Sequence, residues 1–172
     1  MSGVSKPGLS LFLRAAQRAV GLEGEVQVLL ADDRTLRRLN RRFRGKDRAT
    51  DVLSFPAAAT TVFFGEPGGA ELAGDLAISL ETAARQAARF GHSLRDEVRV
   101  LLLHGLLHLT GFDHERDRGE MAAKEAELRR ELGLTPGLIA RATKAVAKGL
   151  SQNDNSPRVD DRKSAVPRRG RR

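Results

Sequence analysis

Hydrophobic and polar positions follow two different periods along this chain of 172 residues. Short apolar runs bounded by turn residues are typical of strands, and they occur at residues 25–31, 51–55 and 75–79. Apolar residues spaced three and four apart are typical of helices. They predict helices over residues 9–20, 33–43, 81–90, 93–109 and 117–132. Early strands mixed with helices, followed by a helical second half, predict one α+β domain.

Residues that start or stop helices lie at the ends of these segments. Asp32 or Asp33 precedes the second helix and Ser93 precedes the fourth, and such side chains cap the first backbone amides of helices. Gly21 and Gly133 stand where two other helices should end, because glycine readily adopts the left-handed conformation that closes a helix.

Weaker patterns mark the rest of the chain. Residues 57–72 contain glycine and proline and predict a loop or loose hairpin, and residues 137–148 predict a short amphipathic helix. Residues 151–172 have many charges and no apolar periodicity, so they bury too little surface to offset the entropy of ordering. We therefore expect one domain over residues 1–150 and a basic, disordered tail over residues 151–172. The alternative for the tail is electrostatic contact with a polyanion.

The chain is basic, but its charge is unevenly placed. It has 30 lysine and arginine residues and 22 aspartate and glutamate residues, which gives a net charge of +8. The tail holds seven basic and three acidic residues, so half of this surplus belongs to it. A basic balance favours polyanionic partners such as RNA. The remaining surplus over residues 1–150 is a modest signal of this kind.

Composition also excludes some classes of protein. The chain has no cysteine, which excludes disulfides and thiolate ligands and leaves histidine nitrogen and carboxylate oxygen for any transition metal. No stretch approaches the roughly 18 apolar residues that span a bilayer. The apolar run before Arg14 lacks the basic region and cleavage site of a signal peptide. We therefore expect a soluble, cytoplasmic protein with no membrane partner.

Three of the four histidines lie close together in the run HGLLHLTGFDH. His104 and His108 are four residues apart, so on a helix they lie about 5–6 Å apart on one face. Gly111 can reverse the chain and return His114 toward this pair. Three neutral imidazoles leave a fourth coordination position open, as is typical of catalytic zinc. The alternative is a set of core histidines. His92, outside the run, is expected to cap a helix or face solvent.

The same spacing occurs in the metzincin peptidases, whose motif is HExxHxxGxxH. The glutamate of that motif is the general base, and here Gly105 stands in its place. Asp113 and Glu115 flank His114, but such carboxylates more often orient a ligand or start a helix. A peptidase would therefore need a glutamate from elsewhere in the fold that points at the metal.

Three segments together resemble one protein family. They are the histidine run, LNRRFRGKDRATDVLSFP at residues 39–56 and GDLAIS at residues 74–79. In this order they resemble the YbeY family of bacterial metal-dependent endoribonucleases, which act in ribosomal RNA maturation. Phe112 stands where many members carry tyrosine, and the resemblance does not cover the tail.

The resemblance implies a single-strand-specific endoribonuclease acting in ribosomal RNA processing, at the 3′ end of 16S RNA, and in ribosome quality control. It implies one divalent ion per chain, which we expect to be Zn²⁺, on His104, His108 and His114. The implied partners are ribosomal RNA, the small ribosomal subunit and its assembly factors. The implied fold is a small mixed sheet with the histidine helix packed behind it.

Phosphodiester cleavage also needs a cation near the phosphate oxygens. Arginine is permanently protonated and binds phosphate through two parallel hydrogen bonds. We assign this catalytic role to Arg44, which glycine follows, because the matching family motif carries arginine there. Lys46 and Arg48 could extend a phosphate-binding groove or be solvated surface charges. Asp75 could orient a ligand histidine, meet a partner protein or stabilise its own turn.

Two questions of function stay open at this level. The ion could activate a water, or it could act as a Lewis acid while the 2′-hydroxyl of the RNA attacks and leaves a 2′,3′-cyclic phosphate. The chain could instead be a non-catalytic ribosome-assembly factor whose metal shapes a docking surface. With seven Phe and no Trp or Tyr, the chain has few rings for stacking bases, so RNA binding should depend mostly on phosphates.

Overall fold

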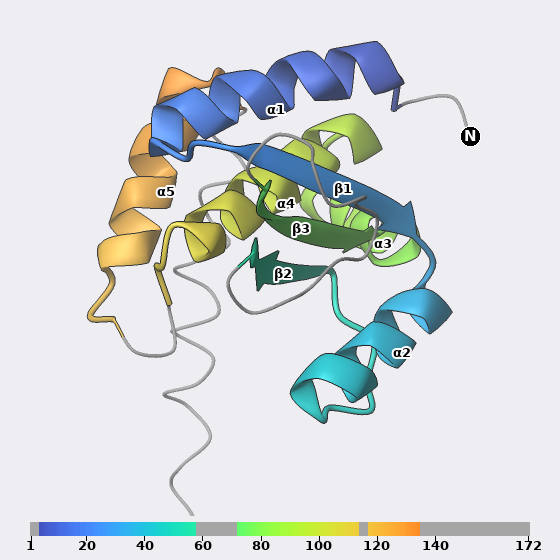
Figure 1. The fold of residues 1–172 in the computed structure, drawn as a ribbon. Coiled ribbons are helices and arrows are strands. Elements are labelled where there is room, and N and C mark those ends of the chain that lie inside the picture. Colours follow the sequence, from blue (N-terminus) through green and yellow to red (C-terminus); the bar gives the residue numbers. More distant parts are fainter. Residues whose placement is uncertain (1–3, 58–71, 114–116, 135–172) are drawn as a thin grey trace, which may run out of the picture.

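The computed structural model describes residues 4–57, 72–113 and 117–134. Within these ranges it has five helices and three strands (Figure 1). They are, in chain order, α1 (Lys6–Val20), β1 (Glu25–Ala31), α2 (Asp33–Arg44), β2 (Val52–Pro56), β3 (Leu72–Ser79), α3 (Leu80–Phe90), α4 (Leu94–Leu109) and α5 (Glu120–Glu131). This mixed order confirms the predicted α+β fold class.

The three strands form one mixed sheet with β3 in the middle. β1 pairs with β3 in parallel, and β2 pairs with β3 antiparallel. Successive side chains of a strand point to opposite faces, so Leu76 and Ile78 pack toward α4 while Ala77 packs toward α2. Because helices cover both faces, β3 is buried from Gly74 to Ser79.

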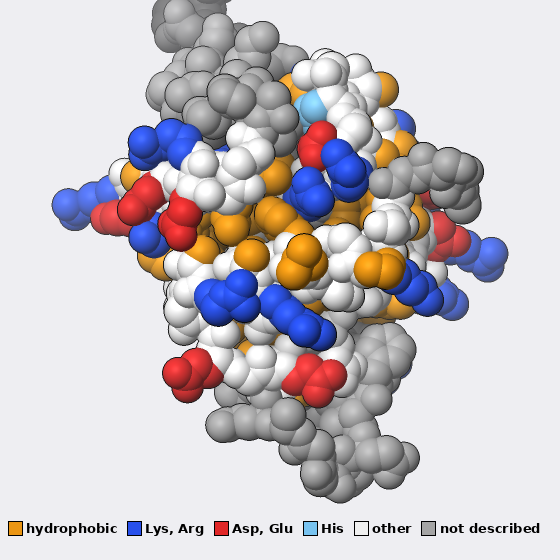
Figure 2. Space-filling view, turned by 90° about the horizontal axis from the view of Figure 1, so that it is seen from above, with side chains coloured by type: hydrophobic (Ala, Val, Ile, Leu, Met, Phe, Trp, Pro, Cys, Tyr) orange, Lys and Arg blue, Asp and Glu red, His pale blue; other side chains and the backbone are white. Residues whose placement is uncertain are grey.

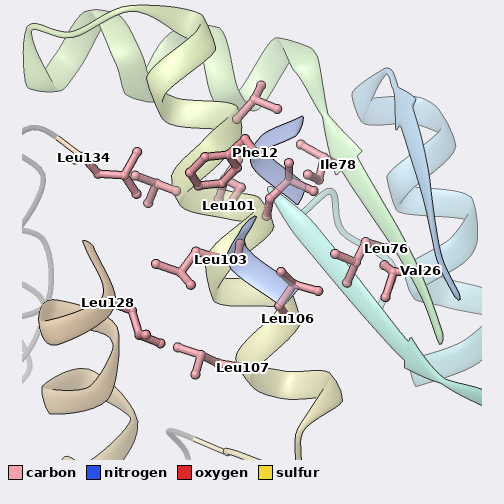
Figure 3. Packing of buried hydrophobic residues seen from close by; sticks show 14 of the residues in the cluster. Phe12, Val26, Leu76, Ile78, Leu101, Leu103, Leu106, Leu107, Leu128 and Leu134 are labelled. Carbon is pink, nitrogen blue, oxygen red and sulfur yellow. The ribbon is translucent and has the colours of Figure 1, made fainter. Parts of the chain in front are cut away.

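Helix α4 is the central helix of the core. Nine of its 16 residues are buried, because the sheet, α1, α3 and α5 all contact it. Leu107 of α4 lies next to Leu128 of α5, and Leu76 of β3 next to Val26 of β1 (Figure 3). A helix that is apolar around most of its circumference is typical of this position. Each fully buried leucine contributes about 2–3 kcal/mol.

Strand β3 is longer than its sequence pattern predicted. The run after Gly74 indicated a start at Asp75, whereas β3 begins at Leu72 and passes through Gly74. A Cβ atom on Gly74 would lie 2.6 Å from the Phe55 carbonyl oxygen and 2.8 Å from the Leu109 side chain. Glycine is therefore needed here for the close approach of three elements, and not for a turn.

Two helices begin at residues other than those predicted. Helix α1 begins at Lys6 and not at residue 9, because Pro7 in its first turn is compatible with a helix start. Helix α5 begins at Glu120 and not at residue 117. The Asp117 carboxylate accepts hydrogen bonds at 2.8 Å from the amides of Gly119 and Met121, so Asp117 lies before the helix and satisfies one of its first amides, while Gly119 occupies the N-cap position.

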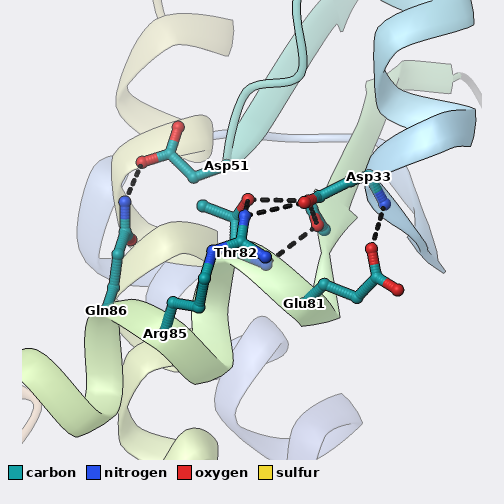
Figure 4. A network of polar contacts seen from close by, with 7 residues as sticks. Asp33, Asp51, Glu81, Thr82, Arg85 and Gln86 are labelled. Carbon is teal, nitrogen blue, oxygen red and sulfur yellow. Dashed lines mark hydrogen bonds and ion pairs between the residues drawn. The ribbon is translucent and has the colours of Figure 1, made fainter.

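A polar network around Asp33 joins the start of α2 to the start of α3 (Figure 4). The Asp33 carboxylate accepts hydrogen bonds from the hydroxyls of Ser79 and Thr82 and from the Arg85 guanidinium, the last at 2.7 Å. The Glu81 carboxylate accepts from the Asp33 amide at 3.0 Å. These contacts lower the pKa of the Asp33 carboxyl from 3.8 to about 2, and the hydrogen bond from Ser79 contributes most. The network fixes the start of α2 against the sheet.

The side chain of His92 is buried against Glu97, so the prediction that it caps a helix or faces solvent is wrong. Its side chain is 7% exposed, and its Nε2 atom lies 2.5 Å from the carboxylate of Glu97, whose side chain is fully buried. The His92 ring also stacks on Phe90, with centroids 6.2 Å apart. The sequence did not reveal this pair because acidic residues in a first helical turn usually serve the helix N-terminus.

Helix α1 lies across the top of the sheet in Figure 1. From that side, hydrophobic side chains lie among separated Lys and Arg side chains (Figure 2). Phe12 and Ala16 of α1 are buried, whereas Leu11 is 71% exposed. None of the described helices is both long enough and apolar enough to cross a membrane. The helix predicted over residues 137–148 and the predicted tail lie outside the described residues, as does the loop predicted over residues 57–72 apart from its two end positions, of which Leu72 belongs to β3.

Candidate functional site

Two histidines project from the last turns of α4. His104 and His108 are half-buried, and most of the residues around them in the helix are buried leucines that face the core. Their ring centroids lie 4.8 Å apart, and their Nε2 atoms lie 3.2 Å apart. The four-residue spacing thus brings the two imidazoles together on one face of the helix.

Hydrogen bonds at the Nδ1 atoms fix the tautomers of both rings. His108 Nδ1 donates to the Phe112 carbonyl oxygen at 2.9 Å, and a carbonyl oxygen can only accept. His104 Nδ1 donates to the Glu125 carboxylate at 3.1 Å. When Nδ1 of a neutral imidazole carries the proton, Nε2 carries a lone pair. Two lone pairs therefore converge, and they repel each other unless a cation or a proton lies between them.

Glu125 holds His104 from the neighbouring helix α5. Burial acts to raise the pKa of the Glu125 carboxyl, but the hydrogen bond with His104 and the nearby Arg129 guanidinium outweigh it and lower the pKa. Arg129 forms an ion pair with Glu125 one turn further along α5. The sequence analysis missed Glu125. Its only signal was an acidic residue four positions before a basic one, which is common on solvated helices.

The turn after α4 holds His108 through the backbone. Gly111 has a φ of 94°, and the Phe112 amide donates to the Leu107 carbonyl at 3.1 Å. This turn returns the Phe112 carbonyl to His108. Because the contact uses a backbone atom, phenylalanine in place of tyrosine at residue 112 does not remove it.

The separation of the two Nε2 atoms fits a shared transition-metal ion. Two Zn–N bonds of about 2.0–2.1 Å at a tetrahedral angle place their nitrogens roughly 3.3 Å apart, and the observed separation is 3.2 Å. His114, the predicted third ligand, lies outside the described residues. Among the residues that the structure does describe, no group of three or more histidine, aspartate or glutamate side chains forms a metal site.

The histidine pair opens into a cleft of about 480 Å³ between the end of α4, β2 and the segment after α2. Its lining residues are Asn40, Arg44, Lys46, Arg48, Thr50, Asp51, Val52, Leu53, Ser54, Pro56, His104, His108, Gly111, Phe112 and Asp113. The cleft therefore brings together the two segments to which the sequence analysis assigned the chemistry, although they are far apart along the chain.

Arg44 enters the cleft from the end of α2. Its guanidinium donates to the Ser54 carbonyl oxygen at 3.4 Å, and the residue is otherwise exposed. The Ser54 hydroxyl is buried and donates to the Gly105 carbonyl of α4 at 3.2 Å. Ser54 thus links β2 to α4 through its hydroxyl and accepts the hydrogen bond from Arg44 with its carbonyl oxygen. The role of Arg44 in charge stabilisation stays a prediction.

Comparison with known proteins identifies the family. The family model described as endoribonuclease YbeY matches residues 9–133. This chain belongs to that family. A Koribacter versatilis protein named endoribonuclease YbeY is 54% identical over 152 residues, which cover 88% of this chain and 93% of the relative. A Solibacter usitatus protein of the same name is 49% identical over 136 residues, which cover 79% of this chain and 85% of the relative.

A solved structure is also similar to this YbeY-family chain. The solution structure of a Thermotoga maritima protein has a TM-score of 0.48 and 24% sequence identity, over 91% of this chain and 97% of that protein. This likeness is too weak to support an argument, so membership of the YbeY family rests on the sequence matches.

Asn40 orders the basic loop of this YbeY-family site. Asn40 is 3% exposed, its side-chain amide donates to the Arg48 carbonyl at 2.8 Å, and its own carbonyl accepts from the Lys46 amide at 3.3 Å. Arg37 binds the Asp47 carboxylate through hydrogen bonds of 2.7 and 2.9 Å. These contacts hold Lys46 and Arg48 at the edge of the cleft. The sequence analysis missed Asn40, because a polar residue among arginines gives no signal of burial.

Asp75 lies within β3 and is 5% exposed, so the alternative in which it stabilises its own turn is wrong. It shares with Ala77 the face of the sheet opposite to α4. We therefore assign the orienting contacts of the two histidines to Glu125 and to the Phe112 carbonyl, and not to Asp75.

Gly105 packs against the sheet, where the metzincin glutamate would have to fit. A Cβ atom on Gly105 would lie 2.8 Å from a methyl group of Leu76 and 3.3 Å from the Ser54 hydroxyl. Glu125 contacts His104, but at Nδ1 and not on the Nε2 side of the ring. Helix α4 of this YbeY-family chain therefore has no glutamate at the position of the metzincin general base.

Proposed function

We propose that this chain is an endoribonuclease that cleaves RNA in the cleft between α4 and β2. The observation that carries the proposal is the convergence of the Nε2 atoms of His104 and His108 in the same cleft as Arg44. Phosphodiester cleavage needs a group that polarises the phosphate and a cation that stabilises the negative charge developing on it. An ion held by the two histidines would provide the first, and Arg44 would provide the second. The name of the family supports the same reaction.

We infer that His104, His108 and His114 hold one divalent ion, and that this ion is Zn²⁺. Imidazole ligands and the absence of cysteine exclude thiolate sites and disfavour Mg²⁺ and Ca²⁺. A bound ion of this kind supplies Lewis-acid charge to a phosphate oxygen or lowers the pKa of a water. Glu125 and the Phe112 carbonyl keep both Nδ1 atoms protonated and therefore keep both Nε2 atoms available.

Arg44 would bind the phosphate that is cleaved. Its planar guanidinium can donate two parallel hydrogen bonds to phosphate oxygens, and these bonds strengthen as negative charge develops there. Lys46 and Arg48 line the same cleft and would bind neighbouring phosphates. The strand would thus be positioned mainly through its backbone, which carries no sequence information.

The finer assignments follow from the family. We propose small-subunit ribosomal RNA as the substrate, the small ribosomal subunit and its assembly factors as partners, and the cytoplasm as the place of action. The support on this chain is its charge: residues 33–48 hold eight basic and two acidic residues, a density suited to a polyanion.

Single-turnover cleavage of labelled single-stranded RNA tests the proposed reaction. Untagged wild type is compared with His104→Ala and His108→Ala preparations purified in parallel, so that a contaminating ribonuclease would act in all three. We expect cleavage only by wild type, with loss on chelation and recovery on adding the ion. Equal cleavage by all three preparations would contradict the proposal. RNA binding without any cleavage would instead favour the assembly-factor alternative.

The chemical nature of the product ends distinguishes the two roles of the ion. Attack by the 2′-hydroxyl leaves a 2′,3′-cyclic phosphate on the 5′ fragment, whereas direct attack by water forms no cyclic phosphate. A substrate with a single 2′-deoxy nucleotide at the cleavage position gives the matched control, since only the first route needs that hydroxyl.

A further inference from the structure

Phe43 is an exposed aromatic residue at the end of α2, directly before the cleft-lining residue Arg44. Its exposure is 38%, and the other large hydrophobic side chain exposed in the described part of the chain is Leu11. Arg44 follows it directly and reaches Ser54 in the cleft. The ring of Phe43 is therefore placed one residue from the cation to which we assign the reacting phosphate.

A buried neighbour fixes the orientation of this ring. Phe43 packs edge-to-face on Phe55 of β2, with centroids 5.3 Å apart and planes at 66°. Phe55 is 6% exposed and belongs to the core cluster between α2 and the sheet. The contact with Phe55 thus anchors the Phe43 ring, while part of the residue stays exposed to solvent. A ring held in this way loses little conformational entropy when a ligand packs on it.

One cation lies over the ring and others follow it along the chain. The Arg42 guanidinium lies 5.2 Å from the centroid of Phe43, as a cation–π contact. Arg44 and Lys46 follow along the chain at the cleft. A base that packed on Phe43 would therefore have its own phosphate and the next one within a basic segment. Aromatic rings interleaved with cations are typical of surfaces that bind single-stranded nucleic acid.

We propose that Phe43 stacks an unpaired base of the RNA strand that enters the cleft. This inference rests on the proposed function and adds to it a contact that selects unpaired nucleotides. In a duplex the base faces are covered by their neighbours, whereas an unpaired base can turn out and stack on a protein ring. Such stacking tolerates any base, because every base has a π-face. Phe43 would therefore select single-stranded RNA without reading its sequence.

The absence of tryptophan and tyrosine from this chain allows a direct test. The variant Phe43→Trp carries a single tryptophan, whose fluorescence is quenched when a base stacks on it. The full-length protein is titrated with a 2′-O-methyl oligonucleotide, which has no free 2′-hydroxyl, with the same sequence as a duplex, and with inorganic polyphosphate. We expect quenching by the single strand alone. The matched control is Leu11→Trp, an exposed position on α1, where none of the three ligands should quench.

A second variant keeps the packing on Phe55 but removes the aromatic face. Phe43→Leu should weaken binding of the single-stranded oligonucleotide by about tenfold and leave polyphosphate binding unchanged, as measured by competition against a labelled oligonucleotide. Equal quenching of Phe43→Trp by polyphosphate, or oligonucleotide binding without quenching, would overturn the stacking contact. Neither result would contradict the proposed function, which is contradicted instead if the wild-type protein does not cleave RNA.

Discussion

Each imidazole of α4 uses its Nδ1 atom for a contact with another part of the protein, and its Nε2 atom lies 3.2 Å from the Nε2 atom of the other imidazole. The two contacts differ in kind, because Glu125 supplies a negative charge to His104 and Phe112 supplies a neutral carbonyl to His108. A carboxylate partner makes an imidazole a stronger ligand and fixes its orientation. Neither contact could be identified from the sequence, since one crosses between helices and the other depends on the turn after α4.

Loss of either imidazole should remove the metal. We expect His104→Ala and His108→Ala each to lower metal content strongly, as measured by elemental analysis of untagged protein. Wild type should lose roughly 5 °C or more in Tm on chelation, because an ion that binds only the folded state stabilises it. The variants should show no effect of chelation. His92→Gln, which changes the histidine paired with Glu97, should retain metal. Equal metal content in all four proteins would refute the site.

Arg44 should contribute to the rate more than to affinity. Lysine at this position keeps the charge but loses the planar fork. Arg44→Lys should therefore reduce the single-turnover rate at saturating RNA by at least tenfold and leave RNA affinity nearly unchanged. Arg34→Lys, at the other end of α2, is the matched control and should change neither. A wild-type rate for Arg44→Lys at saturation would show that Arg44 serves binding and not the reaction.

At the scale of helices and strands, sequence signals worked where a single residue sets an end. The Asp32 carboxylate accepts a hydrogen bond from the Thr35 amide at 2.8 Å, and Gly21 closes α1 with a φ of 69°. Sequence signals failed where contacts with another helix or strand determine the role of a residue. Gly74 looks like a strand start in sequence, but in the fold it lies against Phe55 and Leu109. Such contacts depend on how α4 packs on the sheet, which no local pattern contains.

The contact between α2 and α3 should make stability sensitive to acid. The pKa of Asp33 is about 2 in the folded protein, below its ordinary 3.8, so the ionised carboxylate stabilises the fold above about pH 4. That contribution disappears as the pH falls toward 2. We expect Asp33→Asn to reduce the free energy of unfolding by about 1 kcal/mol at pH 7, because the carboxylate is partly solvated.

Urea unfolding followed by circular dichroism from pH 7 to pH 3 measures this contribution. The difference between wild type and Asp33→Asn should shrink as the pH falls below 4, since Asp33 then becomes protonated in the unfolded chain but stays ionised in the folded protein, whose Asp33 pKa is about 2. Glu23→Gln, an exposed change between α1 and β1, should track wild type throughout. A difference that stays constant with pH would mean that Asp33 acts through helix geometry and not through its charge.

Across the whole molecule, the basic charge gathers in two places. Residues 33–48 hold eight basic and two acidic residues, and residues 151–172 hold seven and three. The net charge summed over residues 1–150 does not reveal the first group, because acidic residues elsewhere offset its positive charge. The fold class and the cleft-forming segments were predictable from sequence, but the position of α2 beside the cleft was not. That position depends on the packing of Leu36 with Leu53 and Phe55 on the sheet.

The basic tail should contribute to RNA binding and not to the cleavage step. The tail lies beyond the family match, which ends at residue 133. Truncation before Ser151 removes seven basic side chains. For a single strand, the slope of log affinity against log salt falls by about 0.7 for each phosphate that the protein no longer neutralises. We therefore expect weaker RNA binding with a flatter salt dependence, and an unchanged single-turnover rate at saturating RNA.

The exposed arginines of α2 give a matched comparison for the tail. The double change Arg34→Gln and Arg38→Gln removes charge from the exposed side of α2 without touching the cleft lining. If phosphates are bound along α2, this variant should also flatten the salt dependence at an unchanged saturated rate. If truncation instead abolishes cleavage at saturation, the tail contributes to the reacting site. The division of the chain into a catalytic domain and a separate tail would then be wrong.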